Sequence, residues 1–481
     1  MPASGKWYFE VTAAFLHNGQ YCGLHGLTKA GTSSRTGILL GTNNDAGYYK
    51  NGTLVQVVSG LTTNDVLGIA VNMDSLTLQG YKNGALWGSS ISIDNATYIP
   101  IVGGNGNNLG DGSKCIANFG QRAFAYPLSG FKALCDTNLP SPLIAKPNTL
   151  MDVALYTGNG STQTISGLNF SPDLVWIKAR SAATAHLLFD QIRGATYYLS
   201  SNATDAESNI PSTTLTAFTS DGFTLGSNSS ANGSSVTLAA WAWDAGTSTV
   251  SNTQGSITSQ VRANVSAGFS IVSYTGTGST GTLGHGLGVK PQLLIVKSRT
   301  QARDWLVYHT SYGATQYTTL NGTGAAAATT SAWNNTEPTS TVFTIGNAAE
   351  INTNGSTNIA YCFAPVVGYS SFGSYTGNGS ASDGPFVYTG FRPKWILVKR
   401  TDSADDWPLM DTVRTPANPQ NAQLWPNFSN AESSPVASSR QWDALSNGFK
   451  LRGDNGAINA SAGTYIYIAF AENPFQYARA R

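Results

Sequence analysis

A chain of 481 residues is too long to fold around one hydrophobic core, so several domains are expected. Charged residues make up only 11% of it and its net charge is +1, which excludes a surface built to follow nucleic-acid phosphates. Hydrophobic residues make up 41%, enough to build cores, so a disordered chain is also excluded. Gly, Ser, Thr and Asn take the place of charged helix formers and favour strands and turns.

The first 140 residues carry the pattern of an antiparallel β-sandwich. Residues 6–11 are aromatic and β-branched and predict a strand. The sequence Tyr-Lys-Asn-Gly occurs at 49–52 and again at 81–84, and Asn-Gly suits the type I′ turn of a tight hairpin. Further strands are predicted at residues 66–74, 98–102 and 115–120.

Four segments of this region resemble SPRY domains. Residues 5–11, which read Gly-Lys-Trp-Tyr-Phe-Glu-Val, are similar to the opening SPRY strand. Residues 65–71, 81–84 and 118–122 are similar to later SPRY segments and follow in the same order. The resemblance implies a bent β-sandwich over residues 1–140 that binds partners through loops at one end and has no catalytic residues.

A proline-containing linker, residues 141–150, is followed by a sequence that repeats three times. Each repeat contains an apolar run bounded by turn residues, which predicts a strand buried on both faces. Twelve residues after the lysine of each run stand Asp190, His309 and Asp411. We therefore expect an array of three related, jelly-roll-like β-sandwiches. Their predicted bounds are 151–250, 251–368 and 369–481, and their apolar runs are 172–180, 291–299 and 393–400.

The repeats resemble modules of marine bacteriophage structural proteins, which commonly follow a SPRY-like domain in tail-fibre-like chains. The likeness is clearest in the first repeat, at residues 170–178, 189–195, 199–202, 221–223 and 241–244. The resemblance implies a virion appendage.

The best charged constellation pairs Asp190 with Arg193 and Asp411 with Arg414. One interpretation is a carboxylate oriented by a base. The other, which we prefer, is a structural ion pair, because the second repeat has His309 and Tyr312 at these positions and keeps its strands. A catalytic device is not expected to change while its scaffold stays.

The sequence offers two other kinds of candidate site, a carboxylate pair and tryptophan rings in loops. Asp402, Asp405, Asp406 and Asp411 lie close in sequence and could offer the carboxylate pair of a glycosidase, although we prefer a solvated loop. Aromatic rings stack on sugars, and four tryptophans lie in polar loops where an exposed ring suggests a partner. These glycan-stacking candidates, which could also be core residues, are Trp305, Trp333, Trp407 and Trp425.

The sequence thus predicts an all-β, non-enzymatic protein of a tailed-phage virion, in a tail fibre or similar appendage that contacts host-surface glycans. We expect no metal or other cofactor, no nucleic-acid partner, and association with other virion proteins, with a homotrimer by analogy with fibres. The start of the chain shows no secretory signal and no apolar stretch could cross a membrane, so synthesis in the host cytoplasm is expected. A capsid decoration protein, a polysaccharide depolymerase spike and a bacterial surface lectin are the alternatives.

Overall fold

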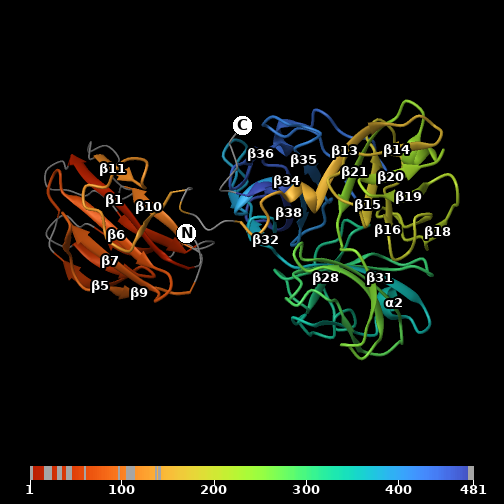
Figure 1. Cartoon of the computed structure of the whole chain (residues 1–481), viewed down its shortest axis with the longest axis horizontal. Coiled ribbons are helices and arrows are strands. Elements are labelled where there is room, and N and C mark those ends of the chain that lie inside the picture. The colour runs from red at the N-terminus through yellow and green to blue at the C-terminus, as the bar shows by residue number, and fades with distance from the viewer. Residues whose placement is uncertain are drawn as a thin grey trace. The chain divides into compact units, whose positions relative to one another are not determined.

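The computed structural model describes residues 4–15, 24–29, 35–39, 46–58, 61–95, 98–103, 114–135, 138 and 142–474. The described residues are nearly all β-structure, so the predicted fold class is confirmed (Figure 1). The chain forms two compact units, Met1–Ser141 and Pro142–Arg481. The predicted boundary at residues 140 and 141 lies outside the described residues.

The first unit contains two sheets, which are antiparallel apart from the parallel pair of β1 and β12. One has the order β11-β1-β6-β7-β8, with β12 beside β1 and β9 beside β7, and the other has the order β10-β2-β3-β4-β5. The strands are β1 (Lys6–Phe15), β2 (Leu24–Lys29), β3 (Arg35–Leu39), β4 (Ala46–Lys50), β5 (Thr53–Val58), β6 (Val66–Asn72), β7 (Thr77–Lys82), β8 (Ala85–Leu86), β9 (Ile91–Ser92), β10 (Tyr98–Gly103), β11 (Lys114–Asn118) and β12 (Lys132–Ala133).

Both predicted hairpins of this unit are confirmed. Asn51 and Gly52 join β4 to β5, and Asn83 and Gly84 join β7 to β8. All four residues have positive φ, between 49° and 83°, as a type I′ turn requires.

The second unit contains the three repeats, and each repeat has an inner sheet, a smaller outer sheet and one short helix. In the first repeat the inner sheet is β13-β21-β15-β16 and the outer sheet is β14-β20-β19. After the short 3₁₀ helix η2 (Pro147–Thr149), its elements are β13 (Met151–Thr157), β14 (Gln163–Ile165), β15 (Leu174–Ala179), β16 (Leu187–Asp190), β17 (Tyr197–Tyr198), β18 (Ser208–Asn209), β19 (Leu215–Thr219), β20 (Gly222–Leu225), α1 (Ser229–Asn232) and β21 (Thr237–Trp243).

The third repeat copies this order, with inner sheet β32-β38-β34-β35 and outer sheet β33-β37-β36. Its elements are β32 (Ser370–Thr376), β33 (Phe386–Tyr388), β34 (Phe391–Arg400), β35 (Leu409–Asp411), η3 (Ser438–Arg440), β36 (Trp442–Leu445), β37 (Gly448–Leu451), α3 (Gly456–Asn459) and β38 (Thr464–Pro474).

The second repeat has extra strands at both ends of its inner sheet, which has the order β22-β23-β24-β31-β26-β27-β28-β29, beside the outer pair β25-β30. Its elements are β22 (Thr249–Asn252), β23 (Ser259–Asn264), β24 (Phe269–Thr275), β25 (Gly281–Gly284), β26 (Leu293–Ser298), β27 (Leu306–His309), β28 (Gln316–Thr319), β29 (Ala327–Ala328), β30 (Val342–Ile345), α2 (Ala349–Asn352) and β31 (Thr357–Phe363).

The repeated apolar strands are buried on both faces, as their continuous hydrophobic pattern predicts. In β15, Val175 and Ile177 pack into the core of their own repeat, whereas Leu174 and Trp176 point the other way. The alternation of side chains along a strand explains this division. In β26 and β34 the same alternation holds, so each inner sheet offers a second apolar face.

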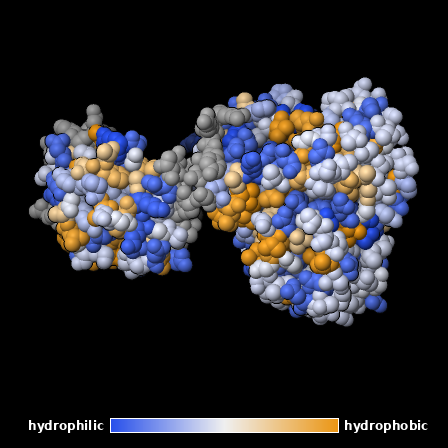
Figure 2. Space-filling view, in the orientation of Figure 1, coloured by the Kyte–Doolittle hydropathy of each residue, from blue (hydrophilic) through white to orange (hydrophobic). Residues whose placement is uncertain are grey.

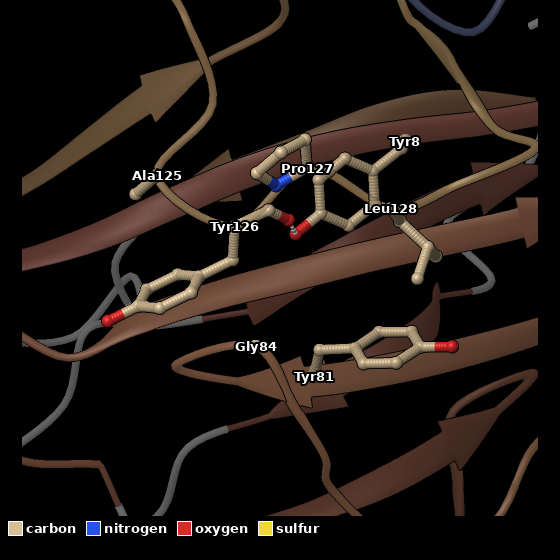
Figure 3. Close-up of a pocket in the computed structure, with 7 residues that line it drawn as sticks. All are labelled: Tyr8, Tyr81, Gly84, Ala125, Tyr126, Pro127 and Leu128. Carbon is tan, nitrogen blue, oxygen red and sulfur yellow. Dashed lines mark hydrogen bonds between the residues drawn. The ribbon is translucent and has the colours of Figure 1, made fainter.

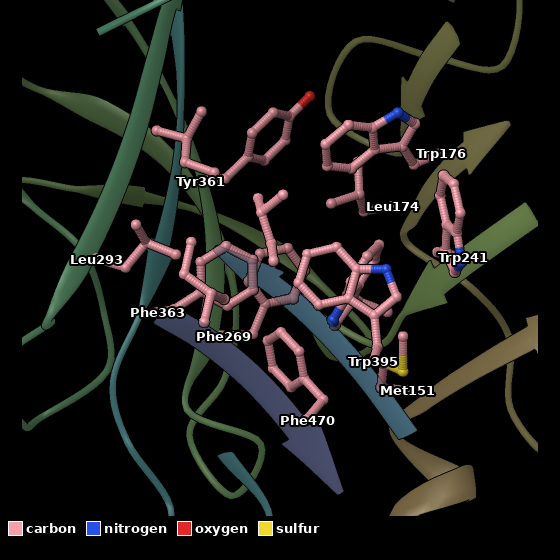
Figure 4. Packing of buried hydrophobic residues seen from close by; sticks show 14 of the residues in the cluster. Met151, Leu174, Trp176, Trp241, Phe269, Leu293, Tyr361, Phe363, Trp395 and Phe470 are labelled. Atoms are coloured by element: carbon pink, nitrogen blue, oxygen red, sulfur yellow. The ribbon is translucent and has the colours of Figure 1, made fainter. Parts of the chain in front are cut away.

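These second faces meet in one common core that all three repeats share (Figure 4). The ring of Trp243 from the first repeat lies 5.7 Å from both Trp395 and Phe470 of the third, measured between ring centroids. Phe363 of the second repeat also lies 5.7 Å from Phe470. The repeats are therefore not an array of separate sandwiches, as the sequence suggested, but parts of one compact unit.

Backbone hydrogen bonds close this unit into a ring. The carbonyl two residues after each repeated lysine accepts a hydrogen bond from the preceding repeat. Arg299 O accepts from Glu207 N at 2.7 Å and Thr401 O accepts from Ala326 N at 2.9 Å. The third bond runs from Glu432 N back to Arg180 O, at 2.7 Å. Three equivalent bonds that join the first repeat to the second, the second to the third and the third to the first define an approximate threefold arrangement within one chain.

Candidate functional site

The four tryptophans predicted as glycan-stacking residues are buried, so that prediction is wrong. Trp305 and Trp407 are 0% exposed, Trp333 is 1% exposed and Trp425 is 9% exposed. A ring can stack on a sugar only if one of its faces is open, and polar loop sequence around these rings did not mean that they were open. They are packing residues, which was the other interpretation of their positions.

Trp305 and Trp407 each donate a hydrogen bond across a joint, which is the interface between one repeat and the next. The indole of Trp305 donates to Ser200 O of the first repeat at 2.9 Å, and that of Trp407 donates to Thr319 O of the second at 3.0 Å. Each stands eight residues after the lysine of its strand, and His186 has the same place in the first repeat. That equal spacing is a signal in the sequence by which Trp305 and Trp407 could have been assigned to the repeated scaffold.

Asp190 and Arg193 form a buried ion pair at the joint between the first and second repeats. Arg193 Nε lies 2.5 Å from Asp190 Oδ2, and both side chains are 0% exposed. Glu207 continues the cluster and pairs with Arg299 of the second repeat at 2.8 Å. The hydroxyl of Tyr361, also from the second repeat, donates to Asp190 at 2.9 Å. The pair therefore holds two repeats together.

The joint between the third and first repeats has the same cluster. Arg414 Nε lies 2.6 Å from Asp411 Oδ2 and its Nη1 lies 2.7 Å from Glu432. Glu432 also binds Arg180 of the first repeat at 2.8 Å. Trp241 of the first repeat donates its indole N–H to Asp411 at 3.0 Å. Burial would raise the pKa of Glu432, but the hydrogen bonds from Arg180 and Arg414 hold it below its usual value.

The second repeat makes the corresponding joint without charge. The hydroxyl of Tyr312 donates to Val307 O at 2.8 Å. This is the bond that Arg193 and Arg414 make to the equivalent carbonyls in their repeats. His309 replaces the aspartate, and burial lowers its pKa to about 4, so it is neutral at pH 7. The neighbouring repeat carries Ile468 where the other joints have Tyr361 and Trp241, so it offers no side-chain donor that would need a carboxylate.

Three buried lysines, Lys178, Lys297 and Lys399, form a further repeated feature whose role the sequence did not reveal. Each is 0% exposed and donates to backbone carbonyls of the loop that follows its strand. Lys297 and Lys399 also donate across a joint, to Thr204 O and Thr323 O of the preceding repeats. Burial lowers the pKa of each lysine to about 8. An ammonium group held by carbonyls fixes a loop and is not available to a substrate.

Asp402, Asp405 and Asp406 are held by hydrogen bonds from other groups of the third repeat. Asp402 accepts from Arg400 and from the backbone N–H of Thr464. Asp406 accepts from Asn427, and Asp405 accepts from the backbone N–H of Asp406. These contacts support a loop-fixing role for each carboxylate.

A cavity with a volume of about 290 Å³ lies in the first unit (Figure 3). Tyr8, Tyr81, Tyr126, Pro127 and Leu128 line it, together with Gly84 and Ala125. Tyr8 donates its hydroxyl to Tyr126 O at 3.0 Å.

Glu10 fixes the segment that forms one wall of this cavity. Its carboxylate accepts the backbone N–H groups of Ala125 and Tyr126 at 2.8 and 2.7 Å. The described residues that line the cavity carry no charge, so it fits a neutral ligand that can contact aromatic rings and hydroxyl groups.

The described part of the chain holds no group of three or more His, Cys, Asp or Glu side chains that could bind a metal ion. It also holds no helix long and apolar enough to cross a membrane.

The fold and its joints define a class of protein: a triplicated β-sandwich whose repeats close around one core. Residues 146–474 match a family described as a domain of unknown function, DUF7483. The match covers more than half of the chain, and the chain therefore belongs to the DUF7483 family. It includes all three repeats, so the closed ring corresponds to the family domain. No curated protein matches the chain.

Proposed function

We propose that this chain is a non-enzymatic structural protein of a tailed-phage virion, in a tail fibre or similar appendage that contacts the host surface. The observation that carries the structural role is the ring, in which buried charges and tryptophans of every repeat are used to join the repeats. The resemblance of residues 1–140 to SPRY domains and of the repeats to phage modules supports the place in a virion.

The common core changes the oligomer that we propose. A homotrimer would need apolar sheet faces through which three chains associate. In this protein the second faces of the three inner sheets already pack against one another within one chain. The protein would therefore act as a single-chain unit of threefold form, joined to other virion proteins. Several copies on one particle would give multivalent attachment even if each site is weak.

The cavity beside Tyr81 and Tyr126 is the place in the first unit that we propose for contact with a neutral glycan. Its lining lacks charge and offers tyrosine rings, and the resemblance to SPRY domains implies binding through one end of that sandwich. Figure 2 shows the visible face of the second unit as mostly pale, which means intermediate hydropathy, with separate hydrophilic and hydrophobic patches.

The test is to incubate fluorescently labelled full-length protein with candidate host cells and with isolated phage heads. Coating of cells that soluble host polysaccharide removes would support attachment, and Tyr126→Ala would then reduce coating. Tyr126 is the suitable change because its ring is 40% exposed. Lys290→Met, on the exposed surface of the second unit, is the control that should leave coating unchanged.

Coating of heads alone would contradict attachment and would make the chain a capsid decoration protein. Release of reducing sugar from host polysaccharide would contradict the non-enzymatic role and support a depolymerase.

A further inference from the structure

The second repeat has an insertion that covers one side of its sandwich. Twenty-five residues, 244–268, join β21 to β24, whereas six residues, 364–369, join β31 to β32 at the start of the third repeat. The insertion forms the hairpin β22–β23, and β23 pairs with β24 in antiparallel register from Ser259 to Asn264. It therefore completes an edge of the inner sheet.

The turn of this hairpin also covers the edge of the outer sheet. Ile257 N donates to Thr282 O of β25 at 3.0 Å, and Ser256 exchanges hydrogen bonds of 2.9 Å with Thr282. Ile257 forms a parallel bridge to Leu283 and is buried in the core of the repeat. One extended segment thus binds both sheet edges through its backbone and places an aliphatic side chain between them.

On the same side of the third repeat, in the described part of the chain, no hairpin covers the sheets. There β32 pairs with β38 and, through a single bridge at Ser370, with Val366, while β33 pairs with β37, so both are edge strands. The hydroxyl of Tyr467 links the two edges, at 3.0 Å from Ser371 Oγ and 3.4 Å from Tyr388 O. An edge strand presents unpaired backbone groups to which another strand can bind.

The exposed residues on this open side differ from those of the other repeats. Strand register places Phe386 of β33 in correspondence with Thr282 of the second repeat and Thr164 of the first. Tyr388 likewise corresponds to Gly284 and Ser166. Phe386 and Tyr388 are each 42% exposed, while Val387 between them is buried. Two adjacent aromatic rings on an open edge are typical of a surface that a partner covers.

We propose that the edges of β32 and β33 bind an extended segment of a partner polypeptide through backbone hydrogen bonds, as residues 249–264 bind the second repeat. The second repeat supplies the template for the backbone hydrogen bonds, and Phe386 and Tyr388 add contact area that the template lacks. This is recognition by β-strand addition. The first repeat has the same open edges but threonine and serine in place of the rings, so it binds such a segment more weakly. The proposal does not depend on a role in a virion.

The probe is a synthetic peptide of residues 247–266 with a photoreactive leucine analogue in place of Ile257. It is added to the intact full-length protein, whose second repeat is already covered by its own hairpin. Cross-links are expected in β32 and β33, together with amide exchange at residues 386–388 that is about tenfold slower.

Replacing the two rings by the residues of the second repeat, Phe386→Thr with Tyr388→Gly, should weaken peptide binding about tenfold. The converse change, Thr164→Phe with Ser166→Tyr, should create comparable binding on the first repeat. Val289→Thr, at an exposed position of the second repeat, is the matched control and should change nothing.

Cross-links that lie elsewhere, or that persist in the Phe386 and Tyr388 variant, would overturn the proposal, as would the absence of cross-links at millimolar peptide. Slower exchange of β33 with dextran in place of the peptide would also overturn it, because the rings would then form a sugar-binding surface.

Discussion

Two joints of the ring are ionic and one is neutral, although the same strands meet at all three. Arg193 and Arg414 each connect a buried aspartate to a glutamate, whereas Tyr312 and His309 make the corresponding joint without charge. The aspartate is present where the neighbouring repeat offers a tyrosine or tryptophan donor and absent where it offers Ile468. The apolar packing that the three joints share therefore closes the ring, and the polar cluster adapts to the neighbour at each joint.

The largest expected effect comes from breaking an ionic joint. Arg414→Met leaves Asp411 buried without its cation and should lower the free energy of unfolding by about 3–5 kcal/mol. At the neutral joint Tyr312→Phe removes the hydroxyl that bonds Val307 O and Thr318 Oγ1 and should cost about 1–2 kcal/mol. Urea unfolding of the full chain, followed by tryptophan fluorescence, measures both. Equal costs would contradict the distinction between the joints, and Lys290→Met, in an exposed pair, is the control.

A smaller effect is expected when an ionic joint is converted into a neutral one. The triple variant Asp190→His, Arg193→Tyr, Tyr361→Ile transfers the residues of the neutral joint to the first and second repeats. Because it leaves no unpaired charge, it should cost about 1–2 kcal/mol, less than half the cost of Arg193→Met alone. A triple variant no more stable than this single variant would show that the joints are not interchangeable.

Acid should weaken the ionic joints through Glu432. It should also weaken the neutral joint, because the pKa of His309 is lowered to about 4 and the stability of its neutral form is lost as the pH falls from 6.5 through that value. The pKa of Glu432 is lower in the folded protein than its usual 4.5, so its contribution to stability is present above pH 4.5 and is lost as the pH falls through the folded pKa. Thermal unfolding between pH 6 and pH 3 should show this loss. Glu432→Gln should flatten that part of the profile, and an unchanged slope would contradict the assignment.

A further predicted change concerns the three buried lysines, one in each repeat. Their pKa falls from 10.5 to about 8 on folding, so the folded state releases protons first and stability should rise with pH above about 8. Above pH 10 the buried tyrosines oppose this rise, since burial raises the pKa of Tyr156, Tyr274 and Tyr375 well above 10. Calorimetry between pH 7.5 and pH 10 should detect the rise, and Lys178→Met should reduce it. A flat profile would contradict the shift.

Local pattern was enough for much of the fold. The Asn-Gly pairs specified two hairpins because only certain residues tolerate their positive φ. Continuous apolar runs specified strands buried on both faces, and equal spacings along the chain revealed the repeat. The candidate sites were predicted less well. Trp305 and Trp407 stand in polar loops, and local polarity does not tell whether a distant segment covers a ring.

The sequence by itself determined the all-β class, the hairpins and the threefold repetition, because these depend on side-chain alternation, turn geometry and spacing. Only the tertiary structure decided that the second faces of the three inner sheets pack on one another, that two of the joints are ionic and one is neutral, and that a hairpin covers the edges of the second repeat and not those of the third. A buried face carries the same hydrophobic pattern whatever packs against it, so the identity of its partner appears only when the chain is folded.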